Sequence, residues 1–177
     1  MSGVPVRKIH HIGIVVEKLD RAYGFYRDTL GLPLIREAEV RDQGVRVALL
    51  AAGESEIELL EPIAAGTGVE RFLKKRGEGL HHLCFETPDV AGALSGLRAR
   101  AVSLIDQTPR PGLAGMIAFL HPRSCAGILI ELLTPTESAP LPASPLRFKR
   151  LVLGAQDPRE TSRIFKELFC LSEQAVN

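Results

Sequence analysis

One stretch of this chain occurs twice. Moving residues 11–30 forward by 71 positions places His11 on His82 and aligns the apolar residues that follow. Each copy begins with a histidine pair, "HHIGIVV" at 10–16 and "HHLCFET" at 81–87. In both copies alternating apolar residues predict a strand, and apolar residues at three- and four-residue steps then predict a helix. The repeat predicts two small, similar modules that share a core.

Three more strand-like runs follow the helix in each copy. They cover about 33–40, 44–51 and 55–61 in the first copy, and about 102–105, 115–120 and 127–133 in the second. The expected fold class is therefore α+β, with two βαβββ modules. We place these modules at about 8–62 and 80–135 within a domain of residues 1–135, and a helix at 69–76 joins them.

The end of the chain carries a weaker third copy. Residues 136–145 are proline-rich and predict a linker, because proline disfavours both helix and sheet interiors. Beyond it, a shift of 139 positions brings residues 148–171 under the same strand–helix pattern, with Arg150 in the place of His11. We interpret residues 146–177 as a partial third module; the alternative is an amphipathic extension that matches by chance.

Composition excludes several classes of function. The formal net charge is only +1, which gives no broad attraction for nucleic acid or an anionic membrane. The first residues contain no apolar stretch of the kind found in a signal peptide or a membrane span. The three cysteines lie far apart and form no Cys-x-x-Cys motif, which is typical of a cytoplasmic protein.

Strand alternation gives the two repeated histidines a common direction. Side chains on a strand point alternately to its two faces, and the face that carries Ile12 and Ile14 should pack on the helix. His11 then points to the opposite, inner face. The same parity places His82 on the inner face of the second copy.

Two glutamates follow the histidines at similar spacing. Glu58 comes 47 residues after His11, and Glu131 comes 49 residues after His82, each within an apolar run. A lone charged carboxylate in such a run costs several kcal/mol to bury without a partner. A single histidine or glutamate in a strand is usually a structural or solvent-facing residue, but two of each at repeated positions favour a metal site.

Mixed nitrogen and oxygen ligands suit a divalent metal ion such as Co, Mn, Ni or Zn, with positions left open for water or substrate. We therefore predict the metal ligands His11, Glu58, His82 and Glu131. The neighbouring His10 and His81 are expected beside the ligands or at the surface. Two further glutamates in the first copy, Glu56 and Glu61, are expected to be solvated.

The chain resembles the vicinal oxygen chelate (glyoxalase/bleomycin-resistance) superfamily, and within it the methylmalonyl-CoA epimerases. The stretches that carry the resemblance are "HHIGIVVEKLDRAYGFYRDTLGL" (10–32), "DQGVRVALL" (42–50), "EIELLEP" (56–62), "FLKKRGEGLHHLCFET" (72–87) and "IAFLHPRSCAGILIELL" (117–133). The resemblance implies a sheet that curls around a metal held by the same four residues. It also implies an acyl-CoA substrate and a homodimer.

The reaction implied by the resemblance interconverts (2R)- and (2S)-methylmalonyl-CoA. A proton is taken from C2 and returned by way of an enolate that the metal ion stabilises. Inversion needs an acid/base group on each side of the carbon. Glu131 is one candidate, and the resemblance carries the other role to Asp42 in "DQGV", whose alternative is a simple turn residue before Gly44.

Two other functions remain open at this point. One is another metal-dependent, glyoxalase-like lyase or isomerase, for example one that acts on a glutathione thiohemiacetal. The other is a metal-free binding or resistance protein of the same fold, which the full ligand set disfavours. Segments 72–87 and 117–133 favour the epimerase.

Overall fold

The computed structural model describes residues 3–136 and 140–172. By its internal contacts the chain forms two units. The first unit comprises His10–His82 with Ser138–Arg150, and the second comprises the remaining residues. The predicted domain limits, 1–135, 136–145 and 146–177, stay a prediction, and residues 137–139 of the expected linker and 173–177 of the expected third module lie outside the described residues.

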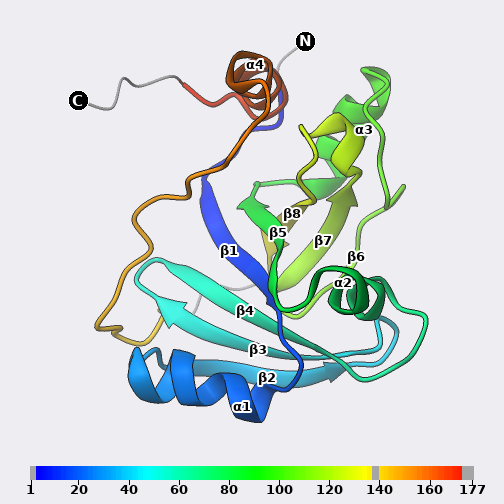
Figure 1. Ribbon diagram of the computed structural model, residues 1–177. Helices are drawn as coiled ribbons and strands as arrows, with labels where there is room; N and C mark the ends of the chain where they lie inside the picture. Colours follow the sequence, from blue (N-terminus) through cyan, green and yellow to red (C-terminus); the bar gives the residue numbers. More distant parts are fainter. Residues whose placement is uncertain (1–2, 137–139, 173–177) are drawn as a thin grey trace. The chain divides into compact units, whose positions relative to one another are not determined.

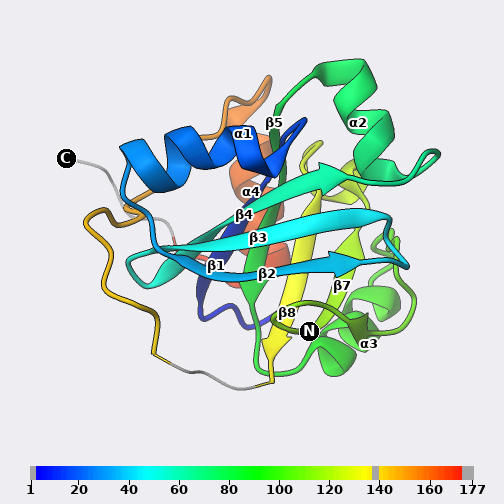
Figure 2. The same ribbon diagram turned by 90° about the horizontal axis from the view of Figure 1, so that it is seen from below.

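The first unit is built from the first copy of the repeat. Its elements are β1 (Lys8–Val15), α1 (Leu19–Tyr23), the π-helical stretch η1 (Gly24–Thr29), β2 (Leu34–Val40), β3 (Val45–Ala52), β4 (Ser55–Pro62) and α2 (Gly68–Arg76). Strand β1 pairs parallel with β4, and β2, β3 and β4 pair antiparallel, so the strand order is β2-β3-β4-β1. Figures 1 and 2 show α1 lying along this sheet.

The second unit repeats that topology. Its elements are β5 (Gly79–Glu86), of which Gly79–His82 count with the first unit, α3 (Val90–Ala99), β6 (Arg110–Pro111), β7 (Gly115–Leu120), the short 3-10 helix η2 (Pro122–Ser124), β8 (Ile130–Pro135) and α4 (Pro158–Phe169). Strand β5 pairs parallel with β8, and β6, β7 and β8 pair antiparallel. The strand order β5-β8-β7-β6 is therefore the counterpart of β1-β4-β3-β2.

Each unit thus contributes four strands with both parallel and antiparallel pairing beside its helices, which confirms the α+β fold class. One strand boundary was wrong. The run at 102–105 makes only a single bridge, from Leu104 to Leu120, and the edge strand is β6 at Arg110–Pro111. A short run of β-favouring residues forms a strand only where a partner lies along its length.

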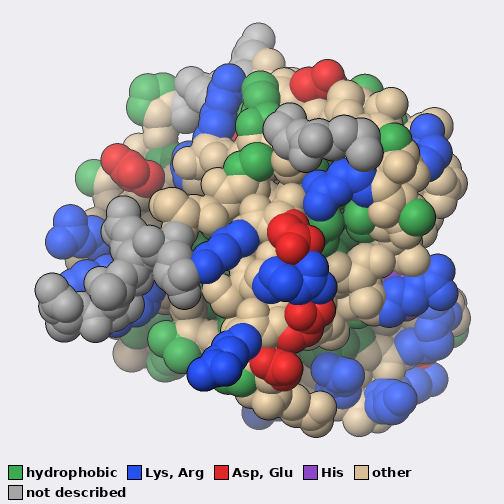
Figure 3. All heavy atoms as spheres, turned by 90° about the horizontal axis from the view of Figure 1, so that it is seen from above, with side chains coloured by type: hydrophobic (Ala, Val, Ile, Leu, Met, Phe, Trp, Pro, Cys, Tyr) green, Lys and Arg blue, Asp and Glu red, His purple; other side chains and the backbone are tan. Residues whose placement is uncertain are grey.

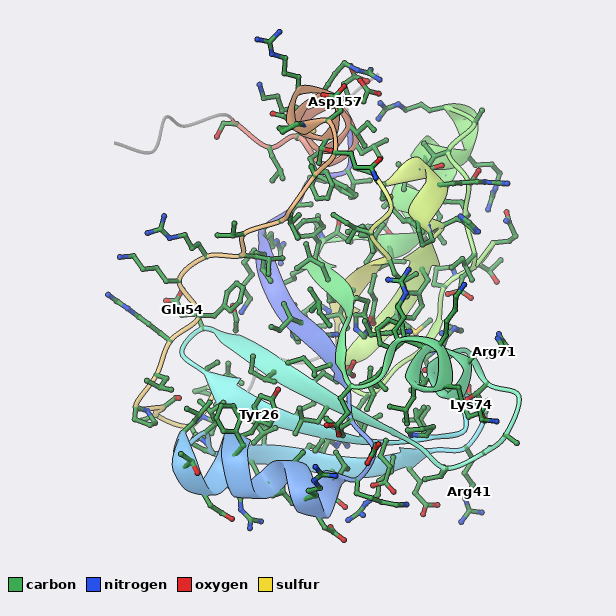
Figure 4. The ribbon with its side chains drawn as sticks, in the orientation of Figure 1. Tyr26, Arg41, Glu54, Arg71, Lys74 and Asp157 are labelled. Atoms are coloured by element: carbon green, nitrogen blue, oxygen red, sulfur yellow. The ribbon has the colours of Figure 1, made fainter. Side chains whose placement is uncertain are left out.

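The apolar core of the first unit confirms the predicted helix-side face. Ile12 and Ile14 pack against a buried cluster that includes Leu19 and Tyr23 of the helix. Tyr26 also packs on this cluster, and Figure 4 shows it between the helix and the strands. The expected α-helix changes to π-helix after five residues, because the Leu30 amide bonds to the Phe25 carbonyl five residues earlier.

The C-terminal extension forms a helix but not the strand that its repeat pattern suggests. Helix α4 begins at the N-cap Asp157, labelled in Figure 4, whose side chain accepts a hydrogen bond from the Glu160 amide. In the second unit its Phe165 and Phe169 pack on Phe85 of β5. No strand forms in the described stretch 140–157.

Residues 146–150, within this stretch, belong to the first unit. The Phe148 amide donates to the Ala52 carbonyl at the end of β3, and the Phe148 side chain packs on the core cluster. Residues 146–150 therefore extend the first unit, while α4 extends the second.

The expected solvation of Glu56 and Glu61 is wrong, because both are buried. Glu61 lies on the helix-side face of β4, and its carboxylate accepts hydrogen bonds from the Leu19 amide and the Lys18 ammonium group. The Leu19 amide is one of the unpaired donors at the start of α1, where Lys18 offers no side-chain cap. Glu61 of β4 thus caps the start of α1, where the residue before the helix provides no side-chain cap.

The surface and the cysteines agree with the composition. Figure 3 shows basic and acidic side chains interleaved on the face that it presents. Among the described residues no helix has both the length and the apolar character needed to traverse a bilayer. All three cysteines are free thiols, and Cys84 and Cys125 are buried like ordinary apolar residues.

We predict that Glu61→Gln lowers the free energy of unfolding by about 1–2 kcal/mol at neutral pH, because a charged cap at a helix start is lost. Burial alone would raise the pKa of Glu61, but the Leu19 and Lys18 hydrogen bonds hold it below 4.5. The lowered pKa stabilises the fold above pH 4.5, and this contribution is lost as the pH falls through the folded-state value.

Urea unfolding of the wild type and Glu61→Gln should therefore give curves that converge in acid. The matched control is Glu39→Gln, which changes an exposed glutamate that forms an ion pair with exposed Arg41 and should cost less than about 0.5 kcal/mol. Equal effects of the two substitutions, or a Glu61 effect that does not change with pH, would contradict the capping role.

Candidate metal centre

The two repeated histidines meet inside the first unit. His11 of β1 and His82 of β5 are only 2% and 3% exposed. Their Nε2 atoms lie 3.1 Å apart, and their rings are nearly perpendicular. Strand alternation thus sends both imidazoles to the same inner face, as the sequence predicted.

Glu58 joins the two imidazoles from strand β4. The parallel pairing of β1 with β4 places Glu58 opposite Gly13, two residues beyond His11. Its Oε2 atom lies 3.2 Å from Nε2 of His82 and 3.7 Å from Nε2 of His11. Three of the four predicted ligands therefore converge on one point.

Gly13 makes room for this arrangement. It lies between His11 and Glu58 on the inner face, and a Cβ atom there would be 2.1 Å from Cε1 of His82. No such contact is tolerated between non-bonded atoms, so any larger residue at this position would displace the His82 ring.

The three donor groups fit a divalent metal ion. Two atoms bound to one ion at about 2.1 Å lie about 3.0 Å apart in adjacent octahedral positions and about 3.4 Å apart in tetrahedral ones. The separations among Nε2 of His11, Nε2 of His82 and Oε2 of Glu58 run from 3.1 to 3.7 Å. Imidazole nitrogen with carboxylate oxygen is also the donor mixture that zinc, cobalt and nickel accept.

Glu131, the fourth predicted ligand, lies in the second unit. It is buried in β8, at 4% exposure, on the face it shares with Leu133. The parallel pairing of β5 with β8 places it opposite Cys84, two residues beyond His82. This register matches that of Glu58, which lies opposite the residue two beyond His11. Its role as a ligand and as an acid/base stays a prediction.

Asp42 is exposed in the turn between β2 and β3. Its neighbour Arg41, labelled in Figure 4, marks the place of this turn. Gly44, which ends the turn, has a φ of 63°, a conformation that glycine adopts without strain. The assignment of Asp42 as the second acid/base also stays a prediction.

The first histidine of each pair lies beside a ligand. The Nδ1 atom of His10 is 3.0 Å from Nδ1 of His11, and the Nδ1 atom of His81 is 3.1 Å from Nδ1 of His82. The sequence predicted that His10 and His81 lie either beside the ligands or at the surface, and the structure places each one beside the next histidine of its pair. The sequence feature that drew attention to them is the doubled histidine.

The sequence model of the Glyoxalase/Bleomycin resistance protein/Dioxygenase superfamily matches residues 10–120, which hold the first copy of the repeat, most of the second copy and three of the four predicted ligands. The chain belongs to this superfamily. The match agrees with the paired βαβββ topology and the inward-facing histidines described above.

Relatives within the superfamily are mainly methylmalonyl-CoA epimerases. The uncharacterized protein YqjC of Bacillus subtilis is 40% identical over 131 residues, which are 73% of this chain and 94% of YqjC. The mitochondrial methylmalonyl-CoA epimerase of Mus musculus is 31% identical over 127 residues, covering 71% of each protein. These similarities support an enzyme of the epimerase type.

Solved structures give the same result. The methylmalonyl-CoA epimerase of Mycobacterium tuberculosis matches with a TM-score of 0.72 and 36% identity, over 77% of this chain and 93% of that one. A methylmalonyl-CoA epimerase in complex with methylmalonyl-CoA and NH4+ matches with a TM-score of 0.71 and 38% identity, over 74% and 96%. About a quarter of this chain lies outside each match.

We predict that Gly13→Ala weakens divalent metal binding at least tenfold, because the new methyl group forces the His82 imidazole away from His11 and Glu58. The measurement is a Co²⁺ titration followed by the visible absorption of the bound ion. Gly24→Ala is the matched control, since a Cβ there meets nothing within 4 Å and the backbone is helical. Metal affinity equal in wild type and Gly13→Ala would show that the ring position does not determine binding.

Proposed function

We propose that this protein is a metal-dependent epimerase that interconverts (2R)- and (2S)-methylmalonyl-CoA. The observation that carries the proposal is the convergence of the His11, His82 and Glu58 donor atoms at 3.1–3.7 Å. The relatives supply the reaction class, since proteins that share this topology at 31–38% identity are methylmalonyl-CoA epimerases.

The proposed ligand set is His11, Glu58, His82 and Glu131. Support for Glu131 comes from the register of the repeat, which gives it the same relation to His82 that Glu58 has to His11. A divalent cation held by these residues would supply a Lewis acid for the thioester oxygen, on which negative charge grows when C2 loses its proton. Two neutral imidazoles and two carboxylates also balance a double positive charge.

In this proposal two carboxylates transfer the protons. Glu131 takes the C2 proton on one face of the substrate and leaves an enolate, and the conjugate acid of Asp42 returns a proton to the opposite face. The reverse reaction exchanges the two roles. Burial of Glu131 in an apolar strand and exposure of Asp42 at a turn give the two groups different surroundings.

The substrate is inferred from the same similarity. The solved structure of a methylmalonyl-CoA epimerase in complex with methylmalonyl-CoA supports an acyl-CoA substrate for this chain. The homodimer and the cytoplasmic location stay predictions from sequence. The metal is proposed as Co, Mn, Ni or Zn, because the donor set suits each of these ions.

The decisive experiment is solvent exchange at C2. Metal-loaded wild type should incorporate deuterium from D₂O at C2 of methylmalonyl-CoA and interconvert the two epimers, as followed by NMR. Glu131→Gln should reduce both rates about 100- to 10,000-fold, because an amide cannot take a proton. The control Glu160→Gln changes an exposed glutamate of α4 that is paired with Arg163 and should leave the rates unchanged.

The same experiment has an outcome that contradicts the proposal. A metal-loaded protein that causes no exchange, yet isomerises the adduct of methylglyoxal with glutathione, would be a glyoxalase-like lyase instead. Wild-type exchange rates in Glu131→Gln would refute the acid/base role of that residue. Metal content is measured in each variant, so that loss of the ion is separated from loss of the base.

Asp42 is tested by following each epimer separately in D₂O. If Asp42 serves one face only, Asp42→Asn should slow interconversion about 100-fold while one epimer still exchanges its own C2 proton through Glu131. Asp42→Glu should restore interconversion in part, because the carboxylate returns on a longer chain. Equal interconversion by wild type and Asp42→Asn would leave Asp42 as a turn residue.

A further inference from the structure

The two histidine pairs share one unusual contact. In each pair the rings of adjacent residues are joined through Nδ1, at 3.0 Å between His10 and His11 and at 3.1 Å between His81 and His82. The ring planes are nearly perpendicular, at 83° and 82°, with centroids 5.2 and 5.3 Å apart. The same geometry therefore recurs in both copies of the repeat.

In each predicted ligand histidine, the Nδ1 atom contacts the preceding histidine of the pair. Nδ1 is the ring nitrogen nearer to the backbone, so adjacent residues of a strand can join there. The Nε2 atoms of His11 and His82 are left to face each other and Glu58. Each ligand ring is thus fixed at one nitrogen and presented at the other.

A hydrogen bond between two Nδ1 atoms contains a single proton. A neutral imidazole that binds a metal through Nε2 carries its proton on Nδ1. If His11 and His82 are ligands, they must donate this proton. The Nδ1 atoms of His10 and His81 must then be the acceptors, and each of these rings carries its own proton on Nε2.

We propose that His10 and His81 are positioning residues that hold the protons of His11 and His82 on Nδ1, so that both ligands offer Nε2 to the metal. This inference rests on the metal centre of the proposed function. Metal-binding histidines usually donate their second N–H to a carboxylate or a carbonyl group. A neutral histidine as acceptor fixes the ring without adding charge to a site that already contains carboxylates.

The surroundings of both acceptors favour a fixed orientation. His10 is buried, at 8% exposure. His81 is partly buried, and its ring packs edge-on against Phe72 of α2, with centroids 5.0 Å apart. The helix that joins the two copies thus contributes to the orientation of the second ligand.

Substitutions can distinguish the effect of the hydrogen-bond acceptor from the effect of the volume that the ring fills. In asparagine, Oδ1 occupies the place of the histidine Nδ1 and can accept the same proton, whereas leucine fills the space without an acceptor. His10→Leu and His81→Leu should each weaken Zn²⁺ binding about 10- to 100-fold in a chelator competition. His10→Asn and His81→Asn should stay within about threefold of wild type.

The matched control is His121→Leu. His121 is exposed, belongs to neither histidine pair and accepts a hydrogen bond from the Arg123 amide. Its loss removes one histidine and should leave Zn²⁺ affinity unchanged. Thermal unfolding of every variant without metal reports any general loss of stability separately.

The proton positions are measured directly in the wild type, which avoids dependence on any variant. A long-range ¹H–¹⁵N NMR spectrum of the zinc-loaded, ¹⁵N-histidine-labelled protein should show His11 and His82 protonated on Nδ1, and His10 and His81 protonated on Nε2. A proton on Nδ1 of His10 or His81 would overturn the proposal.

The failures of the two proposals are distinguishable. A wild type that binds no divalent metal would overturn both the metal centre and this inference. A wild type that binds Zn²⁺, with leucine variants that bind it equally well, would overturn this inference alone. Equal weakening by leucine and asparagine would show that packing, and not the acceptor atom, accounts for the effect.

Discussion

The close approach of the Glu58 carboxylate and two imidazole nitrogens is the constraint on which the site depends. A buried carboxylate costs several kcal/mol unless charged or hydrogen-bonding partners surround it, and here the nearest partners are the imidazoles of His11 and His82. Their convergence requires a strand position without a side chain, which Gly13 supplies. The positions of Gly13, the two imidazoles and the Glu58 carboxylate therefore depend on one another.

The repeat explains why so much of this site could be predicted from sequence. The parity of a strand fixes which face each side chain takes, so His11 and His82 had to share a face if both strands carry a helix on the other. The parallel pairs β1–β4 and β5–β8 then place a glutamate opposite the second residue after each histidine. Spacing alone indicated this relation, because the separations of 47 and 49 residues are nearly equal.

Other features could not be predicted because their causes lie in tertiary contacts. Nothing in the sequence around Glu61 indicates that its carboxylate ends at the start of α1, 42 residues earlier in the chain. The change to π-helix at Gly24 follows from hydrogen bonding that apolar spacing does not distinguish from an α-helix. The Nδ1 contacts within the histidine pairs likewise depend on side-chain rotation, and the sequence showed only the doubling.

The third copy of the repeat shows what a strand needs beyond its own residues. β1 and β5 each pair in parallel with a later strand of the same copy, β4 or β8. After Phe148, the described residues contain no strand that could play this part, and Val152 in the strand-like run is 82% exposed. The helix of the copy still forms, because its hydrogen bonds are internal and Phe165 and Phe169 find an apolar surface on Phe85. A pattern of residues therefore suffices for a helix that can pack on an existing surface, whereas a strand also requires a partner strand beside it.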